Sequence, residues 1–240
     1  MKDFCVILVF NKLYLSKAFN TIQQLRKVGL YDGDIVCLFS SDLKNRLRNV
    51  ENESTIAKYF PETNLSKNKK VHKAFQFHKF YCFHTWFKEK YKKCFYIDVG
   101  SNIFKPIDKI INLDCSNKLL AHSDSYPEHK WKLFNQFDEN SEIFKILNTT
   151  YDLNKDYFQS TIMLYDTSII KEDTFEKLVQ LANTYPISKT NDQGILNLYF
   201  NGLFGYWKQI KIKDKETYYY DFWERDGLTK DNYIMLKYLR

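Results

Sequence analysis

The sequence is poor in glycine and proline, with 7 and 4 residues respectively among 240. These residue types dominate turns and flexible linkers, and no stretch of the chain is enriched in them. No segment repeats at a fixed period either. A chain of this length can bury a substantial core, so we expect residues 1–240 to form one domain.

Disulfide frameworks, cysteine metal motifs and long hydrophobic runs are also missing. The chain has 5 cysteines, an odd number, and none stands in a CxxC pair. Cys5, Cys37 and Cys94 lie inside apolar runs, which predicts buried, reduced side chains. The apolar run Phe4–Phe10 is too short to cross a membrane and lacks a cleavage region. We therefore expect a reducing, cytoplasmic compartment and no membrane insertion.

Positive charge is in excess, with 36 Lys and Arg against 29 Asp and Glu and a formal net charge of +7. A basic protein attracts polyanions, so a nucleic-acid-binding protein is one hypothesis. Most lysines have acidic neighbours, however, and the densest clusters, Lys67–Lys70 and Lys88–Lys93, are typical of a solvated loop and an exposed helix end. No zinc-finger, RNP or helix-turn-helix pattern is present. We therefore expect no nucleic-acid partner.

The first hundred residues alternate between strand and helix patterns. Continuous apolar runs at residues 4–10, 34–40 and 94–98 predict strands that are buried on both faces. Helical spacing of apolar residues over 13–28 and 71–91 predicts the helices that accompany them. This alternation indicates an α/β fold with a central, mainly parallel mixed sheet flanked by helices.

The second half of the chain is more mixed. It is predicted to contain strands at residues 118–122, 158–165, 210–212 and 218–220 and helices at residues 171–184 and 191–200.

Three positions are candidate site residues on topology alone. In a parallel sheet, ligands gather at the carboxyl ends of the strands, where loops carry polar groups. Phe10 with Asn11, Asp42 and Asp98 stand at the ends of the first predicted strands. A carboxylate such as Asp98 can hold a divalent cation against a diphosphate, because hard cations prefer carboxylate and phosphate oxygens. It can equally cap the next turn through backbone amides, and position alone leaves both interpretations open.

Four segments resemble glycosyltransferases of family 8, the glycogenin-like family, whose fold is of the GT-A (Rossmann-like) kind. Tyr96–Ile107 resembles the strand and DxD loop of that family, and His78–Phe83, which contains Lys79, resembles the segment with the basic residue on the preceding helix. Phe158–Tyr165 resembles the acceptor-side strand, and Asn191–Phe200 resembles the Asp-Gln helix almost residue for residue. Four segments in the right order are a more specific signal than one short motif. The tail Tyr233–Leu239 also resembles the tails of some virus-encoded glycosyltransferases.

The resemblance implies retaining transfer of a sugar from a nucleoside diphosphate sugar, such as a UDP-sugar, to a hydroxyl group. The acceptor would be a glycan, a protein or a small molecule. Catalytic roles beside the donor sugar and the acceptor are implied for Asp192 and Gln159. Contacts with the donor are implied for Lys79, Asp98, Gly100 and Gln193, and the strand-end residues Phe10, Asn11 and Asp42 would then meet its base or ribose. Asp124, at the end of a predicted strand, can hydrogen-bond hydroxyls of the donor sugar or serve a turn.

The chain departs from the family pattern at the metal site. Gly100 stands where the DxD motif has its second carboxylate, and no histidine follows His129, although the family usually has a later metal-binding histidine. Either Asp98 holds Mn²⁺ or Mg²⁺ with diphosphate and water, or lysine side chains such as Lys79 replace the charge of the metal. A non-catalytic nucleotide- or sugar-binding module with a degenerate metal site is the alternative function.

Lys79 and Asp192 are expected to line an open cleft. Asp192 opens a predicted helix and can serve as its N-cap, or it can face the sugar. In an open cleft, Lys79→Ala and Asp192→Asn would lower turnover far more than they lower the melting temperature.

Overall fold

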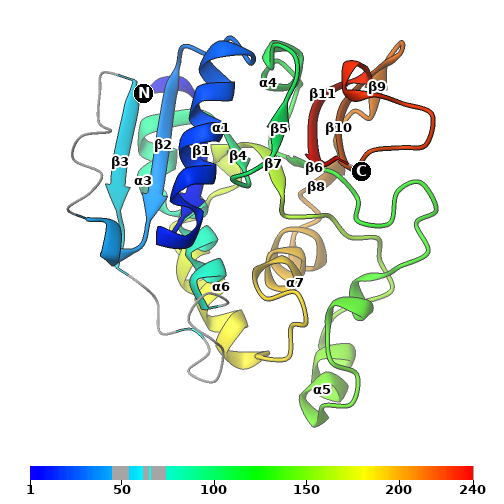
Figure 1. Cartoon of the computed structure of the whole chain (residues 1–240). Helices are drawn as coiled ribbons and strands as arrows, with labels where there is room; N and C mark the ends of the chain where they lie inside the picture. Colours follow the sequence, from blue (N-terminus) through cyan, green and yellow to red (C-terminus); the bar gives the residue numbers. More distant parts are fainter. Residues whose placement is uncertain (45–53, 62–64, 66–73, 240) are drawn as a thin grey trace.

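The computed structural model describes residues 1–44, 54–61, 65 and 74–239. Its central element is a seven-stranded sheet with strand order β3-β2-β1-β4-β7-β6-β8 (Figure 1). The strands are β1 Lys2–Phe10, β2 Asp34–Phe39, β3 Thr55–Tyr59, β4 Tyr91–Ile97, β6 Leu119–Ala121, β7 Ile162–Asp166 and β8 Trp207–Gln209. Strands β3, β2, β1 and β4 are mutually parallel, β7 is antiparallel to β4 and β6, and β6 is parallel to β8. The expected α/β fold with a mainly parallel mixed sheet is confirmed.

The three apolar runs of the first hundred residues lie in β1, β2 and β4, which are neighbours in this sheet. Both faces of β1 are buried because helices cover the sheet on each side. Cys5 packs on the face covered by α3 (Thr85–Lys90), and Val6 packs on the face covered by α1 (Leu15–Lys27) (Figure 1). The helix predicted over 13–28 is therefore present as α1, preceded by the short 3₁₀ helix η1 (Lys12–Tyr14).

The predicted helix over 71–91 is wrong as a single element. Residues 71–73 lie outside the described residues, Phe75–Phe83 form the 3₁₀ helix η4, and α3 starts only at Thr85. His84 separates the two helices with extended backbone at ψ 145°, and its Nδ1 accepts a hydrogen bond from the Trp86 amide at 3.1 Å. The side-chain cap on α3 replaces the backbone hydrogen bond that a continuous helix would need.

A second sheet, which the sequence did not predict, has strand order β5-β11-β10-β9. Its strands are β5 Asn102–Ile103, β9 Lys213–Asp214, β10 Thr217–Trp223 and β11 Tyr233–Tyr238. The predicted strand at 218–220 is part of β10, whereas the strand predicted at 210–212 is wrong because these residues connect β8 to β9. Figure 1 shows this sheet beside β4 and β7, with the C-terminus of the chain next to it.

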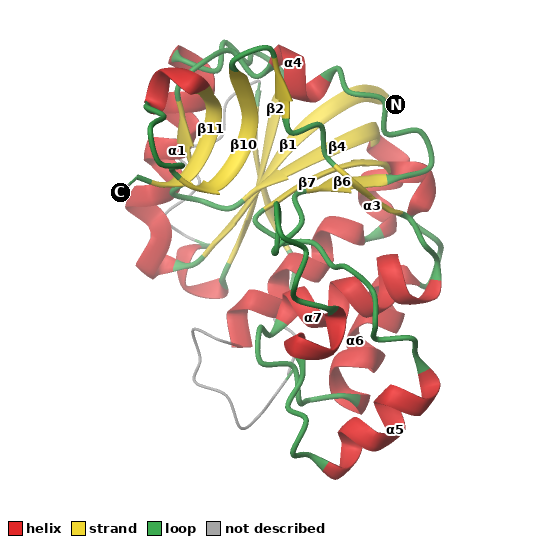
Figure 2. Cartoon of the chain, turned by 90° about the vertical axis from the view of Figure 1, so that its right-hand side faces the viewer, coloured by secondary structure: helices red, strands yellow, loops and turns green. Residues whose placement is uncertain are grey.

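The remaining α-helices are α4 Asp108–Ile111, α5 Glu142–Thr150, α6 Thr174–Thr184 and α7 Asp192–Asn197, and α7 continues into the π-helix η7 Leu198–Leu203. Helices α5, α6 and α7 lie beyond one edge of the main sheet, in the lower half of Figure 2, whereas α4 lies at the top of that view. The 3₁₀ helices are η2 Ser41–Leu43, η5 Leu133–Gln136, η6 Thr167–Ile169 and η8 Lys230–Asn232. The helices predicted at 171–184 and 191–200 are thus confirmed, as is the strand at 118–122. The strand predicted at 158–165 starts only at Ile162.

All five cysteines are buried and free, as predicted for Cys5, Cys37 and Cys94. The predicted loop Lys67–Lys70 lies outside the described residues, and Lys88–Lys93 spans the end of α3 and the start of β4. Within the described part of the chain, every helix is too short or too polar to cross a membrane.

Candidate active site

Most sequence-predicted site residues lie at the edge of the sheet where β1, β2, β4 and β6 end. Phe10 ends β1, Asp98 follows β4, and the Asp98 amide donates a hydrogen bond to the Thr161 carbonyl at 2.8 Å. Because β7 is antiparallel to β4, its starting residues meet the ends of the other strands here. Polar side chains distant in sequence are therefore brought to one edge, as expected for this class of sheet.

Lys79 joins two of the predicted carboxylates. Its Nζ lies 2.9 Å from Asp192 Oδ2 and 3.4 Å from Asp98 Oδ1, and it donates hydrogen bonds to the carbonyl and Oγ of Ser160 at 3.1 Å. Ser160 Oγ in turn donates to Asp192 Oδ2 at 2.9 Å. Burial disfavours the charged ammonium, but Asp192 and Asp98 outweigh this effect and raise the pKa of Lys79. Lys79 is therefore a fixed cation between two anions.

Lys79 and Asp192 are buried, with 8% and 4% of their surfaces exposed. The expected open cleft around these two side chains is wrong, because η4, the Ser160 segment and α7 enclose them. Substitution of either residue removes the partner of a buried charge, so it must affect stability as well as turnover.

Asp192 does not cap α7. The N-cap position belongs to Asn191, whose φ is 54°, and Asp192 is the first helical residue. The Asn191 side chain instead donates a hydrogen bond to Gln76 Oε1. The Asp192 carboxylate is thus directed to Lys79 and Ser160, and its role beside the donor sugar stays a prediction.

Besides Lys79, Asp98 contacts Tyr96 and Lys237, and the sequence did not identify Lys237 as a site residue. The Tyr96 hydroxyl donates a hydrogen bond to Asp98 Oδ1, and Lys237 Nζ of β11 lies 3.8 Å from Asp98 Oδ2. Lys237 also donates to the Val99 carbonyl at 3.0 Å. Burial alone would raise the pKa of Asp98, but Lys79 and Lys237 outweigh it and lower the pKa. A lone lysine inside the apolar run of residues 233–239 was the one signal for Lys237.

Gln159, Asp124 and Gln193 form a hydrogen-bonded group next to Ser160. Gln159 Nε2 donates to Asp124 Oδ1 at 2.6 Å, and Gln193 Nε2 lies 3.4 Å from Asp124 Oδ2. Gln193 Oε1 accepts from the Ser160 amide at 3.0 Å, which connects this group to Asp192. Gln159 Oε1 is buried without a hydrogen-bond partner among the described residues. Fixed amides and a carboxylate with a spare acceptor are suited to the hydroxyl groups of a sugar.

Three further predicted donor contacts, Phe10, Asn11 and Asp42, lie at or just after the ends of β1 and β2. The Phe10 side chain is 2% exposed and packs in the core, while the Phe10 carbonyl accepts from the Ser40 amide at 3.3 Å. Asn11 Oδ1 caps η1 through the Leu13 amide at 3.1 Å, and Asp42 accepts from the Ser40 hydroxyl. These residues lie at the edge of the sheet where β1 and β2 end, and their contacts are local rather than with Lys79 or Asp192.

The residues around Asp98 do not fit a divalent cation. Gly100 offers no side-chain oxygen, and both Asp98 oxygens already face donors from Lys79, Tyr96 and Lys237. Across residues 1–44, 54–61, 65 and 74–239, no group of three or more His, Cys, Asp or Glu side chains could hold a metal. In this structure Asp98 is a carboxylate paired with ammonium groups, and its role as a metal ligand stays a prediction.

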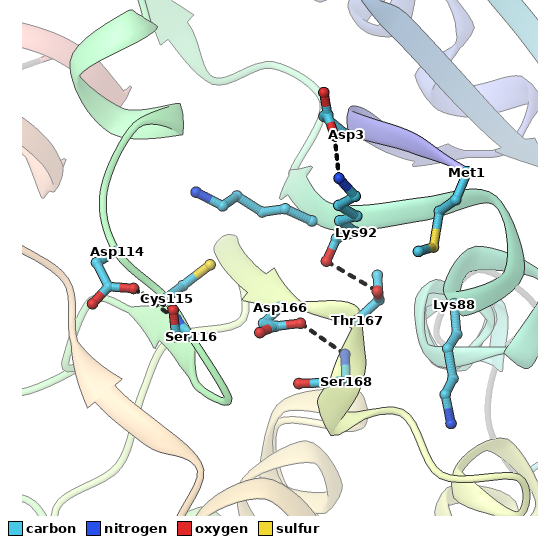
Figure 3. A pocket seen from close by; sticks show the side chains of 11 residues that line it. Met1, Asp3, Lys88, Lys92, Asp114, Cys115, Ser116, Asp166, Thr167 and Ser168 are labelled. Atoms are coloured by element: carbon cyan, nitrogen blue, oxygen red, sulfur yellow. Dashed lines mark hydrogen bonds and ion pairs between the residues drawn. The ribbon is translucent and has the colours of Figure 1, made fainter.

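A pocket of about 650 Å³ lies at the opposite edge of the sheet, where β1 and β4 start (Figure 3). Its polar groups have local partners. Lys92 pairs with Asp3 at 2.9 Å, Thr167 donates to the Lys92 carbonyl at 3.0 Å, and Asp166 accepts from the Ser168 amide. None of the sequence-predicted site residues lines it.

Comparison with known proteins gives a family and a fold. Residues 39–221 match the model of glycosyl transferase family 8. The solved structure of the galactosyltransferase LgtC in complex with donor and acceptor sugar analogs superposes with a TM-score of 0.63 at 12% identity, over 98% of this chain and 86% of that chain. The bifunctional glycosyltransferase WbbM gives a TM-score of 0.63 at 17% identity, over 99% of this chain and 46% of WbbM. The structure of mouse xyloside xylosyltransferase 1 superposes with a TM-score of 0.50 at 11% identity, over 87% of this chain and 85% of that chain. No curated protein matches this chain in sequence.

Proposed function

Because the chain belongs to glycosyltransferase family 8 and is a glycosyltransferase enzyme of GT-A fold, we propose that it retains the anomeric configuration of the sugar it transfers. The donor is a nucleoside diphosphate sugar, with UDP-sugars the first to test, and the acceptor is a hydroxyl group of a glycan, a protein or a small molecule. The whole chain acts as one domain in the cytoplasm, without a nucleic-acid partner.

The observation that carries this proposal is the enclosed group of Lys79, Asp98, Ser160 and Asp192 at the carboxyl edge of the sheet. In the reaction, the bond between the anomeric carbon and the diphosphate oxygen breaks, and a bond from that carbon to the acceptor oxygen forms. Negative charge grows on the leaving diphosphate, which takes up the proton that the acceptor hydroxyl loses. A fixed ammonium group such as Lys79 stabilises that charge without reorganisation.

The sugar is placed by the neighbouring group. Asp192 and Gln159 border the donor sugar and the acceptor, with the free Gln159 Oε1 available to a sugar hydroxyl. Asp124 and Gln193 hold Gln159 and Ser160 in position and face further hydroxyls. The rest of the donor is contacted at the strand ends by Phe10, Asn11, Asp42, Asp98 and Gly100.

A donor-hydrolysis screen tests this function without knowledge of the acceptor. The purified chain is incubated with UDP-, GDP- and dTDP-sugars, and release of the nucleoside diphosphate is measured. We expect release from one nucleotide class, a large loss of rate in Asp192→Asn, and an unchanged rate in Lys92→Met, a lysine at the opposite edge. Stabilisation by a nucleotide without turnover of any donor or acceptor would support the non-catalytic binding module instead.

A further inference from the structure

Three lysines from separate parts of the chain surround the loop that starts at Asp98. Lys79 comes from η4, Lys237 from β11 and Lys17 from α1. Lys79 and Lys237 lie 3.4 and 3.8 Å from the two Asp98 oxygens. The aliphatic part of Lys17 covers Gly100, with its Cδ 3.1 Å from the position that a β-carbon on Gly100 would take.

The positive charge of this cluster is only partly balanced by protein groups. Asp192 and Asp98 pair with Lys79, and Asp98 is shared between Lys79 and Lys237. Lys237 is 8% exposed. Its burial lowers the pKa of the ammonium, Asp98 opposes this effect in part, and Lys79 and Lys17 lower the pKa further. An anion bound beside Lys237 would relieve this electrostatic cost.

A second carboxylate at position 100 is disfavoured by the backbone. Gly100 has a φ of 81°, which side chains other than glycine's adopt only with strain, and its amide donates to Thr21 Oγ1 at 3.0 Å. The space above it is filled by Lys17. A divalent cation at Asp98 would also meet the ammonium groups of Lys79 and Lys237 at close range, and their repulsion opposes its binding.

We propose that Lys237 and Lys17 bind the donor diphosphate and supply the charge that a divalent metal would supply, so that sugar transfer by this chain needs no metal ion. This proposal rests on the proposed function, because it assigns the diphosphate of the same donor to the Asp98–Gly100 loop. Lysine is a compact cation that binds phosphate oxygens as a point charge. Lys237 is held by the Val99 carbonyl, and Lys17 approaches from the exposed side of the loop.

Inorganic pyrophosphate is the probe, because it carries the diphosphate chemistry without a base or a sugar. Its binding to the EDTA-treated full chain is measured by isothermal titration calorimetry, together with UDP, GDP and dTDP. The variants are Lys237→Met, Lys237→Arg and the exposed Lys17→Met, with Lys92→Met as a matched lysine at the opposite edge. Thermal melts show that each variant is folded, and donor hydrolysis is followed with and without Mn²⁺.

We expect pyrophosphate to bind in EDTA, with roughly tenfold or greater weakening in Lys237→Met, since a hydrogen bond to a charged group contributes about 1.5–3 kcal/mol. Lys17→Met should weaken binding less, Lys237→Arg should retain most of it, and Lys92→Met should equal the unmodified chain. Donor hydrolysis should persist in EDTA.

Two results of the binding measurements would overturn the proposal, and one result of the hydrolysis assay would do so as well. One is pyrophosphate binding that appears only when Mn²⁺ is added. The other is binding that Lys237→Met and Lys17→Met leave unchanged. Donor hydrolysis that requires Mn²⁺ would leave the proposed function standing while refuting the lysine site. Metal-free pyrophosphate binding without turnover of any donor would support the lysine site and refute the proposed function.

Discussion

Lys79→Met should destabilise the fold strongly, because it leaves buried carboxylates without their cation. Methionine keeps the length of the side chain and removes the charge. At the observed 2.9 Å, the attraction between Lys79 and Asp192 is roughly 6 kcal/mol in an effective dielectric of about 20. In the intact pair, the desolvation of both charges offsets part of this attraction. Removal of one partner of a buried pair nevertheless typically lowers the free energy of unfolding by about 3–5 kcal/mol. For a chain of this size that corresponds to a fall in Tm of roughly 6–20 °C.

The paired variant Lys79→Met with Asp192→Asn separates this effect from simple loss of packing. Asp192→Asn removes the unpaired charge while keeping the shape, so the double variant should be more stable than Lys79→Met alone. Asp98 retains Lys237 in every variant. The coupling energy from the double-mutant cycle should be about 1–3 kcal/mol. Circular dichroism during urea and thermal denaturation at pH 7 measures all four proteins. A Tm of Lys79→Met within about 2 °C of the unmodified chain would refute the reasoning, as would a double variant less stable than the single one.

Asp192→Asn should lower the rate of donor hydrolysis by roughly a hundredfold, because a contact made to the reacting groups is worth a few kcal/mol in the transition state. Gly100→Ala should lower Tm by roughly 2–4 °C, since the φ of 81° costs a β-carbon about 1 kcal/mol and Lys17 can move aside. The free energy of unfolding should fall as the pH drops below about 6.5. Burial lowers the pKa of His122, despite the nearby Asp221, so the unfolded chain takes up a proton there that the folded chain does not. His122→Asn should flatten this pH dependence in urea titrations.

Each of these expectations has a control. An unchanged rate in Asp192→Asn would remove this residue from the site, provided that the Asn variant melts cooperatively. Gly205→Ala is the matched control for Gly100→Ala. Gly205 also has a positive φ, of 60°, but no atom lies within 4 Å of the position that its β-carbon would take, whereas Gly100 lies against Lys17. An equal pH dependence in His122→Asn and the unmodified chain would show that other groups govern acid sensitivity.

The sequence by itself determined five strands of the main sheet, β1, β2, β4, β6 and β7, and most of the residues that meet at its edge, whereas β3 and β8 were not predicted. Apolar runs such as residues 4–10 and 94–98 can be satisfied only by burial on both faces, which is a local property of the chain. Asp98, Lys79, Gln159, Asp192 and Gln193 could be named because each lies in a short segment with a recognisable pattern. Their order along the chain then predicted one site at one edge.

Only the tertiary structure decided how the charges are balanced. Lys237 is 139 positions from Asp98, and its contact exists because the second sheet, itself not predicted, packs β11 beside the end of β4. The packing of η4 against the Ser160 segment and α7 buries Lys79 and Asp192, which the sequence placed in an open cleft. Local patterns fix which segments form strands and helices, whereas the proximity of distant charges, and with it the electrostatics of the site, depends on how those elements pack.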